Sequence, residues 1–492
     1  MAWYKTVFGI PTLIGLMIGS GFVIPAFWLV SIAGVAWCID YCMQQSSWRV
    51  GLGVAVWIWT VKALITTSFF TSAYPIDWLG SSLGPLEPLI IFFYWSTVSL
   101  WLGIGGVGLY AGIYIAKRVS IWWSYVVLPV FWILGELLGA LSFSFFTYGP
   151  GGSLTTQFSF GYIGYVLAAH GWLIELAHVY GVFGLSLVAI LLAVAARQFW
   201  GNKRWLVIVA IVLLLITSTL RFNTKDIPNT DFYRVATIDT SSPTADRFSE
   251  RGRVALEQQL TMAFDAALAA EVDYIIFPED TRYFDQQDMD VLRAYMTFQY
   301  GVTDTIIIDS SRVQQSEQTV LQAIAYDGKS KDLYESQKRY LVPQGEFLPY
   351  FYQGVLQLVG YDAAIDFLQE SLSYQVGDDT SQADFSERIP GILFCFESID
   401  PLGVRTIMKE RNGNVPFVAH VVSHAWFHTP DGLWQQAESM LRIQAIWNDI
   451  HIVSAGNHMP GYTVSPAGEV LHPTVVDQGE YWKLSVMEIP VR

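Results

Sequence analysis

The stretch GILFCFE, residues 391–397, decides the fold class of the C-terminal half of this chain. Its first four residues are apolar and have the length of a buried strand, and Cys395 follows them directly. Similar apolar runs occur at residues 232–240, 274–277, 305–308, 417–422 and 450–455, and residues 250–271 have apolar side chains at helical spacing. Strands that alternate with helices predict an α/β domain, in which reactive side chains gather beyond the carboxyl ends of strands.

Cys395 is the only cysteine after residue 222, so it cannot form a disulfide within its own half. Three cysteines in 492 residues are too few for a disulfide framework. Cys38 and Cys42 lie four residues apart in an apolar run, and we expect them to be small hydrophobic residues on a buried helix face. Cys395 is therefore either a core residue or a reactive thiol.

Two more candidate residues follow strands in the same half. Glu279 comes directly after the run YIIFP, residues 274–278, and Lys338 opens the stretch KRYLVPQGEFLP, residues 338–349. Taken singly, such a glutamate is usually a helix cap or a solvated residue, and such a lysine usually lies on the surface. The ordered set of Glu279, Lys338 and Cys395 in these local contexts is much more specific than any one of its members.

The N-terminal half has the composition of a membrane domain. Hydrophobic residues make up 52% of the chain and charged residues only 14%, below the roughly 25% charge that is typical of soluble domains. Residues 1–222 have a net charge of +4, whereas residues 223–492 have a net charge of −19, which disfavours nucleic acid as a partner. Seven apolar runs predict spans at about residues 6–24, 26–42, 50–70, 88–110, 120–142, 172–196 and 204–220.

The placement of basic residues predicts the orientation of these spans. Lysine and arginine occur before the first span and in every second loop, whereas the alternate loops at residues 71–87 and 147–171 contain none. This positive-inside pattern places the N-terminus in the cytoplasm and, after seven crossings, the acidic half outside. Lys62 and Glu136 lie inside predicted spans, where a charge is costly and often functional; snorkelling or a wet interior is the alternative for Lys62.

The motifs resemble those of the carbon–nitrogen hydrolase (nitrilase) superfamily. Its signatures are a glutamate after a strand and proline, a lysine near a Pro-x-Gly-Glu run, and a cysteine followed by an aromatic residue and glutamate. They stand here at residues 278–279, at Lys338 with residues 343–346, and at residues 395–397. With the upstream spans, the chain is similar to the apolipoprotein N-acyltransferase family, as the runs at 132–136, 160–165, 180–186, 341–343 and 425–427 also indicate.

The resemblance implies a multi-span α-helical membrane domain at residues 1–222 and an extracytoplasmic α/β nitrilase-like αββα sandwich at residues 223–492. It implies an acyltransferase of lipoprotein maturation in a bacterial inner membrane, with Cys395 as nucleophile, Glu279 as base and acid, and Lys338 as oxyanion stabiliser. The expected partners are a phospholipid acyl donor, a diacylated apolipoprotein acceptor and the bilayer. No cofactor is expected.

Six further residues are candidates for supporting or substrate-binding roles. The resemblance gives Glu346 the role of orienting Lys338, and Glu397 is ambiguous. Phe396 is expected to wall the pocket, and Glu136 to face a lipid or substrate groove. Trp426 and Phe427 could line an acyl channel, although aromatic residues in such a domain are more often core.

The chain departs from the family pattern at several positions. His424 stands where the family has aspartate and His428 where it has glycine, Ser336 replaces an aromatic residue, and Phe396 replaces the common tyrosine. Gln444 stands where the family's Arg-Ala-x-Glu helix motif has arginine, and Ser454 stands where the family has arginine before its Ala-x-Asn motif. The family usually ends with an eighth span, and no eighth apolar run precedes Arg492. The histidines do not have the spacing of a metal site, so we expect none.

Two other functions remain open at this point. The same three residues would serve a membrane-tethered amidase that uses water as acceptor, and the seven spans favour lipid substrates instead. A transporter or receptor with a ligand-binding outer domain would require broken spans and intramembrane charge pairs, for which only Lys62 and Glu136 are candidates.

Overall fold

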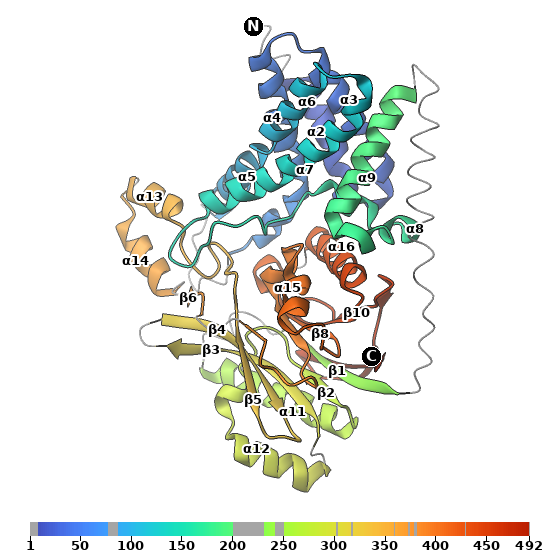
Figure 1. Ribbon diagram of the computed structural model, residues 1–492. Coiled ribbons are helices and arrows are strands. Elements are labelled where there is room, and N and C mark those ends of the chain that lie inside the picture. The colour runs from blue at the N-terminus through green and yellow to red at the C-terminus, as the bar shows by residue number, and fades with distance from the viewer. Residues whose placement is uncertain are drawn as a thin grey trace.

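The computed structural model describes residues 8–76, 87–199, 231–241, 250–301, 304–315, 318–358, 360–371, 374–377, 381–428 and 430–491. It has a helical N-terminal half and a C-terminal half built on a mixed sheet, joined face to face (Figure 1). The predicted boundary at residues 222 and 223 lies outside the described residues.

Apolar helices make up the N-terminal half. They are α2 (Ile10–Val23), α3 (Trp28–Gln44), α4 (Trp48–Thr66), α5 (Glu87–Gly103), α6 (Gly106–Ala116), α7 (Ile121–Phe146), the short α8 (Gly171–Ile174) and α9 (Ala177–Phe199). Many large apolar side chains on their outer faces are exposed, among them Leu29, Phe92 and Trp123. Such a surface is unfavourable in water and favourable in lipid, so these helices belong to a membrane domain.

Five helical stretches of the described chain are long and apolar enough to cross a bilayer: Pro25–Gln44, Trp48–Thr66, Glu87–Ala116, Trp122–Phe146 and Ala177–Arg197. They correspond to five of the predicted spans. The run predicted at 6–24 contains a shorter apolar helix of 14 residues, α2. The run predicted at 204–220 lies outside the described residues, so seven spans stay a prediction.

The helix expected at 172–196 is not continuous. It is broken at Tyr180 and Gly181, where the backbone leaves the helical region and Gly181 has φ of 56°. A Cβ atom at Gly181 would lie 2.4 Å from the ring of Trp447, which belongs to the C-terminal half. Glycine is therefore required here both by the backbone conformation and by the close approach of the two halves.

The sheet of the C-terminal half consists of two sets of strands. The first contains β1 (Phe232–Thr240), β2 (Tyr274–Ile276), β3 (Ile306–Gln315), β4 (Gln318–Asp327), β5 (Leu333–Gln337), β6 (Tyr374–Gln375), β12 (Thr474–Gln478) and β13 (Trp482–Pro490). The second contains β7 (Gly391–Phe394), β8 (Val418–Ser423), β9 (Ile452–Asn457), β10 (Tyr462–Val464) and β11 (Val470–Leu471). The pairing of Thr240 with Asn457 joins β1 to β9 and so connects the two sets.

Helices cover both outer faces of these strands. α11 (Glu250–Ala269) packs on the first set through an apolar cluster that includes Phe264 and Phe277. An apolar core that includes Ile308 and Phe394 fills the space between the two sets. α15 (Gly403–Glu410) and α16 (Asp431–Asn448) cover the second set. The layers therefore follow the order helix, strands, strands, helix.

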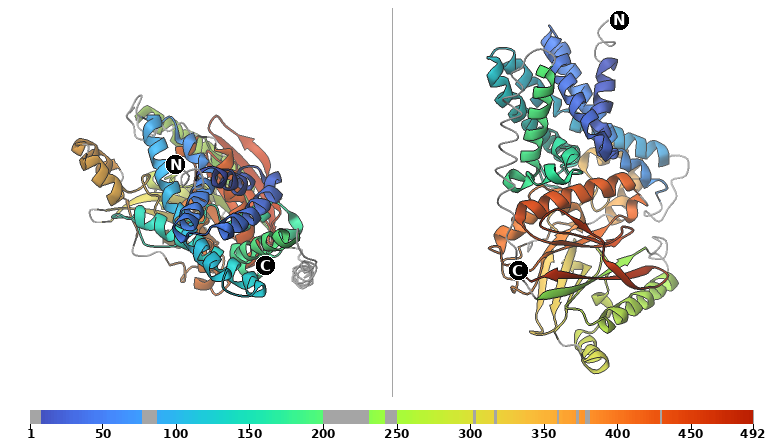
Figure 2. Two further views of the ribbon diagram at one scale, coloured as in Figure 1. Left: turned by 90° about the horizontal axis from the view of Figure 1, so that it is seen from above. Right: turned by 90° about the vertical axis from the view of Figure 1, so that its right-hand side faces the viewer.

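The two halves share a continuous apolar core. α16 lies directly against the membrane helices, as Figure 2 shows in its right-hand view. Leu433, Met440 and Ile443 on α16 belong to the same buried cluster as the membrane helices. Nε2 of Gln436 on α16 donates to the carbonyl oxygen of Thr66, which ends α4. Three small helices, α12 (Met289–Tyr295), α13 (Tyr350–Leu358) and α14 (Asp362–Ser371), lie at the periphery (Figure 1).

Candidate active site

The structure brings Glu279, Lys338 and Cys395 together at the ends of three strands. Glu279 lies three residues beyond β2, and Lys338 follows β5 directly. Cys395 follows β7 and opens a short 3₁₀ helix, η8 (Cys395–Ile399). β2 and β5 belong to the first set of strands and β7 to the second, so the site lies between the two sets.

Lys338 is held between two carboxylates. Its Nζ donates to Oε1 of Glu279 at 2.8 Å and to Oε1 of Glu346 at 2.7 Å, and its side chain is only 1% exposed. Glu346 is fixed in turn because its Oε2 accepts a hydrogen bond from the backbone N–H of Val342. Burial alone would lower the pKa of Lys338, but the two carboxylates outweigh it and raise that pKa above its usual value. Lys338 is therefore a fixed positive charge at the site.

Glu279 has the properties of a base that works near neutral pH. Burial raises its pKa to about 7, against the opposing effect of Lys338 and with a further contribution from Glu346. A general base is most effective when its pKa lies near the working pH, because it then accepts and returns a proton readily.

Cys395 is a half-buried thiol that is protonated at rest. Burial and the neighbouring Glu279 raise its pKa above the usual value, although Lys338 opposes them. Its Sγ donates to the carbonyl oxygen of Ser423, at the end of β8, at 3.5 Å. A thiol in this state needs a base at the moment of attack, and Glu279 is close enough to interact with it electrostatically.

Glu397 organises the turn that carries Cys395. Its Oε1 accepts from the backbone N–H of Arg339 at 2.6 Å, and its Oε2 accepts from the N–H of Phe394 at 3.2 Å. The carboxylate thus ties η8 to the residue that follows Lys338. Glu397 is buried, and its carboxylate fixes the backbone around Cys395.

The aromatic candidates lie toward the membrane half. Phe396 packs against the apolar core of the membrane helices and lines a small cavity of about 20 Å³ that Phe143 of α7 also lines. Phe427 contacts Phe69 and Phe70 in the 3₁₀ helix η2 (Ser68–Ala73), with ring centroids 5.5 and 5.9 Å apart. These two residues therefore form part of the junction between the halves.

Trp426 packs against the loop that holds Glu346, and His424 lies two residues before Trp426. The ring of Trp426 lies so close to Gly345 that a Cβ there would be 2.5 Å away. His424, at one of the departures from the family pattern, is buried, and burial lowers its pKa to about 4. It is therefore neutral near pH 7 and adds no charge to the site.

Glu136 lies in the membrane half, away from the three strand ends. It accepts hydrogen bonds from Nε1 of Trp132, from the backbone N–H of Ile163 and from the hydroxyl of Ser186. Nζ of Lys62 donates to the carbonyl oxygen of Gly161 at 3.0 Å. Both intramembrane charges therefore bind the segment around Gly161 and Ile163, a role that the sequence did not suggest.

Sequence reasoning also missed two residues that hold the nucleophile. The Ser423 carbonyl accepts from Cys395, and Nε2 of Gln444 donates to the carbonyl of Ser398 in η8 at 2.7 Å. The only signal for Gln444 was its place at a departure from the family pattern. A backbone carbonyl such as that of Ser423 leaves no signal in side-chain chemistry.

Comparison with curated proteins finds relatives that are called apolipoprotein N-acyltransferase. The protein from Rhodopseudomonas palustris is 23% identical over 344 residues, 65% of this chain and 62% of that protein. The one from Thermotoga maritima is 25% identical over 75% of this chain and 68% of that protein, and the one from Allorhizobium ampelinum is 24% identical over 89% and 81%. The match with the first of these spans just under two thirds of its length.

Other comparisons add little. No family model matches the sequence. A solved structure of a glutamine-dependent NAD(+) synthetase from Cytophaga hutchinsonii is 10% identical, with a TM-score of 0.32 over 53% of this chain and 43% of that chain, a likeness too low to support an argument. The resemblance predicted from the sequence motifs is confirmed by the curated relatives alone: the chain is similar, at 23–25% identity, to proteins called apolipoprotein N-acyltransferase.

Proposed function

We propose that the protein transfers a fatty acyl chain from a membrane phospholipid to the N-terminal α-amine of the diacylglyceryl-modified cysteine of an apolipoprotein, through a thioester on Cys395. The observation that carries the proposal is the ion-pair cluster of Glu279, Lys338 and Glu346 beside a protonated, half-buried thiol. The relatives' name, apolipoprotein N-acyltransferase, supports the choice of reaction.

In the first half-reaction, the Glu279 carboxylate takes the thiol proton as Sγ of Cys395 attacks the ester carbonyl of the phospholipid. The carbonyl oxygen becomes an oxyanion, which the ammonium group of Lys338 stabilises. The C–O bond to the glycerol then breaks, and protonated Glu279 returns its proton to the departing oxygen. The lysophospholipid leaves, and the acyl chain remains on sulfur as a thioester.

In the second half-reaction, the neutral α-amine of the lipoprotein attacks the thioester carbonyl. Glu279 accepts the proton that the amine loses, the C–S bond breaks, and the thiolate recovers a proton from Glu279. The product is an amide, and both Cys395 and Glu279 return to their starting states. The two substrates follow each other at one site, so we expect ping-pong kinetics.

The membrane half fits substrates that carry acyl chains. Phe396, next to the nucleophile, lines a small cavity together with Phe143 of α7, so the side chain that follows Cys395 faces the apolar helices among which an acyl chain would lie. We propose, from the positive-inside pattern, that the N-terminus is cytoplasmic, that residues 1–222 span the inner membrane seven times, and that residues 223–492 form a nitrilase-like domain on the extracytoplasmic side.

The test is acylation of the purified full chain by a phospholipid with an alkyne-labelled acyl chain, in mixed micelles, with a diacylated lipopeptide as acceptor. The expected result is a hydroxylamine-sensitive label on Cys395 and an N-acylated peptide. Both should be absent in Cys395→Ala, while Cys38→Ala, which removes a thiol buried in the membrane half, should behave like the wild type. Free fatty acid without N-acylated peptide would support the amidase, and no label on Cys395 during turnover would refute the mechanism.

A further inference from the structure

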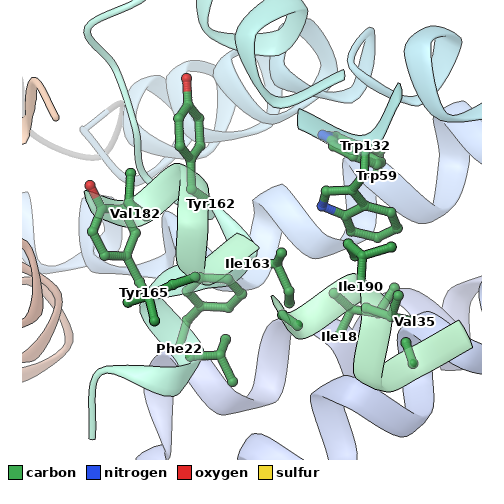
Figure 3. Close-up of a cluster of buried hydrophobic side chains, with 14 of the residues drawn as sticks. Ile18, Phe22, Val35, Trp59, Trp132, Tyr162, Ile163, Tyr165, Val182 and Ile190 are labelled. Carbon is green, nitrogen blue, oxygen red and sulfur yellow. The ribbon is translucent and has the colours of Figure 1, made fainter. Parts of the chain in front are cut away.

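The segment between α7 and α8 is fixed inside the membrane half by polar contacts. It includes the 3₁₀ helix η4 (Ile163–Leu167), whose Ile163 and Tyr165 pack among the membrane helices in Figure 3. Glu136 of α7 accepts from the Ile163 backbone N–H at 2.6 Å, and Lys62 of α4 donates to the Gly161 carbonyl at 3.0 Å. The ammonium group of Lys62 also lies 4.0 Å from the ring centroid of Trp59. This segment is therefore held in one conformation by two charged side chains from separate helices.

One residue of this segment reaches into the C-terminal half. The hydroxyl of Ser159 donates a hydrogen bond to the carbonyl oxygen of Ile399. The Ser159 oxygen also lies 2.8 Å from the hydroxyl of Tyr165, which is the donor in that pair because the Ser159 proton is already engaged. Ser159 is completely buried, so water does not compete for either bond.

Ile399 is the last residue of η8, and Cys395 is the first. Carbonyl groups at the end of such a helix have no partner within it, so a donor from outside is needed there. A 3₁₀ helix rises about 2 Å per residue, which puts the two ends of η8 only about 8 Å apart. A displacement of the Ile399 end is therefore transmitted to the sulfur atom.

The other side-chain hydrogen bonds that hold η8 come from the C-terminal half itself. Glu397 binds the N–H groups of Arg339 and Phe394, and Gln444 binds the carbonyl of Ser398. Among the hydrogen bonds of the described residues to the backbone of η8, the one from Ser159 connects the turn directly to the membrane half. The membrane half thus takes part in placing the nucleophile.

We propose that Ser159 is a positioning residue for Cys395. Its hydroxyl, oriented by Tyr165 on a segment that Glu136 and Lys62 fix among the membrane helices, holds the end of η8 so that the thiol stays close to Glu279 and Lys338. The inference rests on the proposed function only in taking Cys395 as the nucleophile.

The test compares Ser159→Ala with the wild type, both as the full chain in micelles. Two rates at Cys395 are measured: acyl transfer and alkylation. Transfer of an alkyne-labelled acyl chain should slow by about 5- to 15-fold with KM unchanged, as expected for the loss of one buried hydrogen bond that aligns a reacting group. Alkylation by iodoacetamide, located by mass spectrometry, should become faster and reach half its maximum at lower pH. Burial is the largest cause of the raised pKa of this thiol, and a loosened turn is less buried.

Three controls separate positioning from unfolding. Ser142→Ala removes a hydroxyl of α7 that donates to the Leu138 carbonyl of its own helix, and both rates should stay within twofold of the wild type. Tyr165→Phe keeps the Ser159 hydroxyl but removes the group that orients it, so a smaller loss of two- to fourfold is expected. Cys38 and Cys42, buried in the membrane half, should stay unreactive in every variant that keeps the fold.

Acylation and alkylation rates of Ser159→Ala within twofold of the wild type would overturn the proposal, as would an equal effect of Ser142→Ala. Should the wild type form no acyl adduct at all, the proposed function fails. The iodoacetamide rates would then decide on Ser159 by themselves, because they require no lipid substrate.

Discussion

Replacing Glu346 by glutamine is expected to move the pH dependence of Cys395 acylation to lower pH. Only the carboxylate form of Glu279 can accept the thiol proton, so the rate of the wild type should fall as the pH drops through the Glu279 pKa of about 7. The negative charge of Glu346 raises this pKa. Its removal should therefore let Glu279 ionise at lower pH.

The distances from Lys338 to the two glutamates set the size of the expected shift in the Glu279 pKa. Nζ of Lys338 lies 2.8 Å from the bonded oxygen of Glu279 and 2.7 Å from that of Glu346, so these two oxygens are at most about 5.5 Å apart. Two unit charges at that distance interact by about 3 kcal/mol at an effective dielectric constant of about 20, and one pKa unit corresponds to about 1.4 kcal/mol. The pKa of Glu279 should therefore fall from about 7 to about 5 in Glu346→Gln.

The assay is the initial rate of labelling of Cys395 by an alkyne-labelled phospholipid, measured from pH 4.5 to 9 in mixed micelles. The plateau rate should also decrease, because a carboxylate with a lower pKa is a weaker base. Glu410→Gln serves as the matched control, since Glu410 pairs with Arg339 outside the cluster around Lys338 and should leave the profile unchanged. An acid limb that stays near pH 7 or moves upward in Glu346→Gln would refute this account of the site.

Two further changes test other contacts of the site. Lys338→Met should slow Cys395 labelling by about 100- to 1,000-fold, because the oxyanion loses its stabilising charge and the pKa of Glu279 rises. Single-turnover labelling measures this rate, and a loss below tenfold would contradict the role of Lys338. Glu397→Gln should lower the free energy of unfolding by about 1–3 kcal/mol, because charge-assisted hydrogen bonds to the N–H groups of Arg339 and Phe394 become neutral or are lost. Thermal unfolding in detergent measures this, and an unchanged transition would show that the carboxylate does not stabilise the turn.

The candidate site was largely predictable because its residues follow strands. Glu279, Lys338 and Cys395 each come after a short apolar run, and strand ends of an α/β domain converge on one region. Glu346 could be found because it lies in the same short segment as Lys338. The structure adds that Lys338 bonds both glutamates at once, a geometry that sequence spacing does not specify.

The fold was predictable where local chemistry decides it. Long apolar runs gave five membrane helices, and runs of strand length gave the sheet. The break at Gly181 was not foreseen, because the ring that packs against it belongs to Trp447, more than 250 residues away in the chain. The contact of Ser159 with Ile399 is of the same kind, since it depends on how two halves dock and leaves no local pattern.

The core shared by the two halves has a consequence for how the protein is made. Leu433, Met440, Ile443 and Ile446 of α16 are buried in one apolar cluster with side chains of the membrane helices. A newly made C-terminal half that meets incompletely inserted helices would expose this apolar face to water, which favours aggregation and proteolysis. Insertion defects in the helices should therefore lower the cellular amount of the whole protein. The abundance of the protein in cells would then reveal a defect in membrane assembly without an enzyme assay.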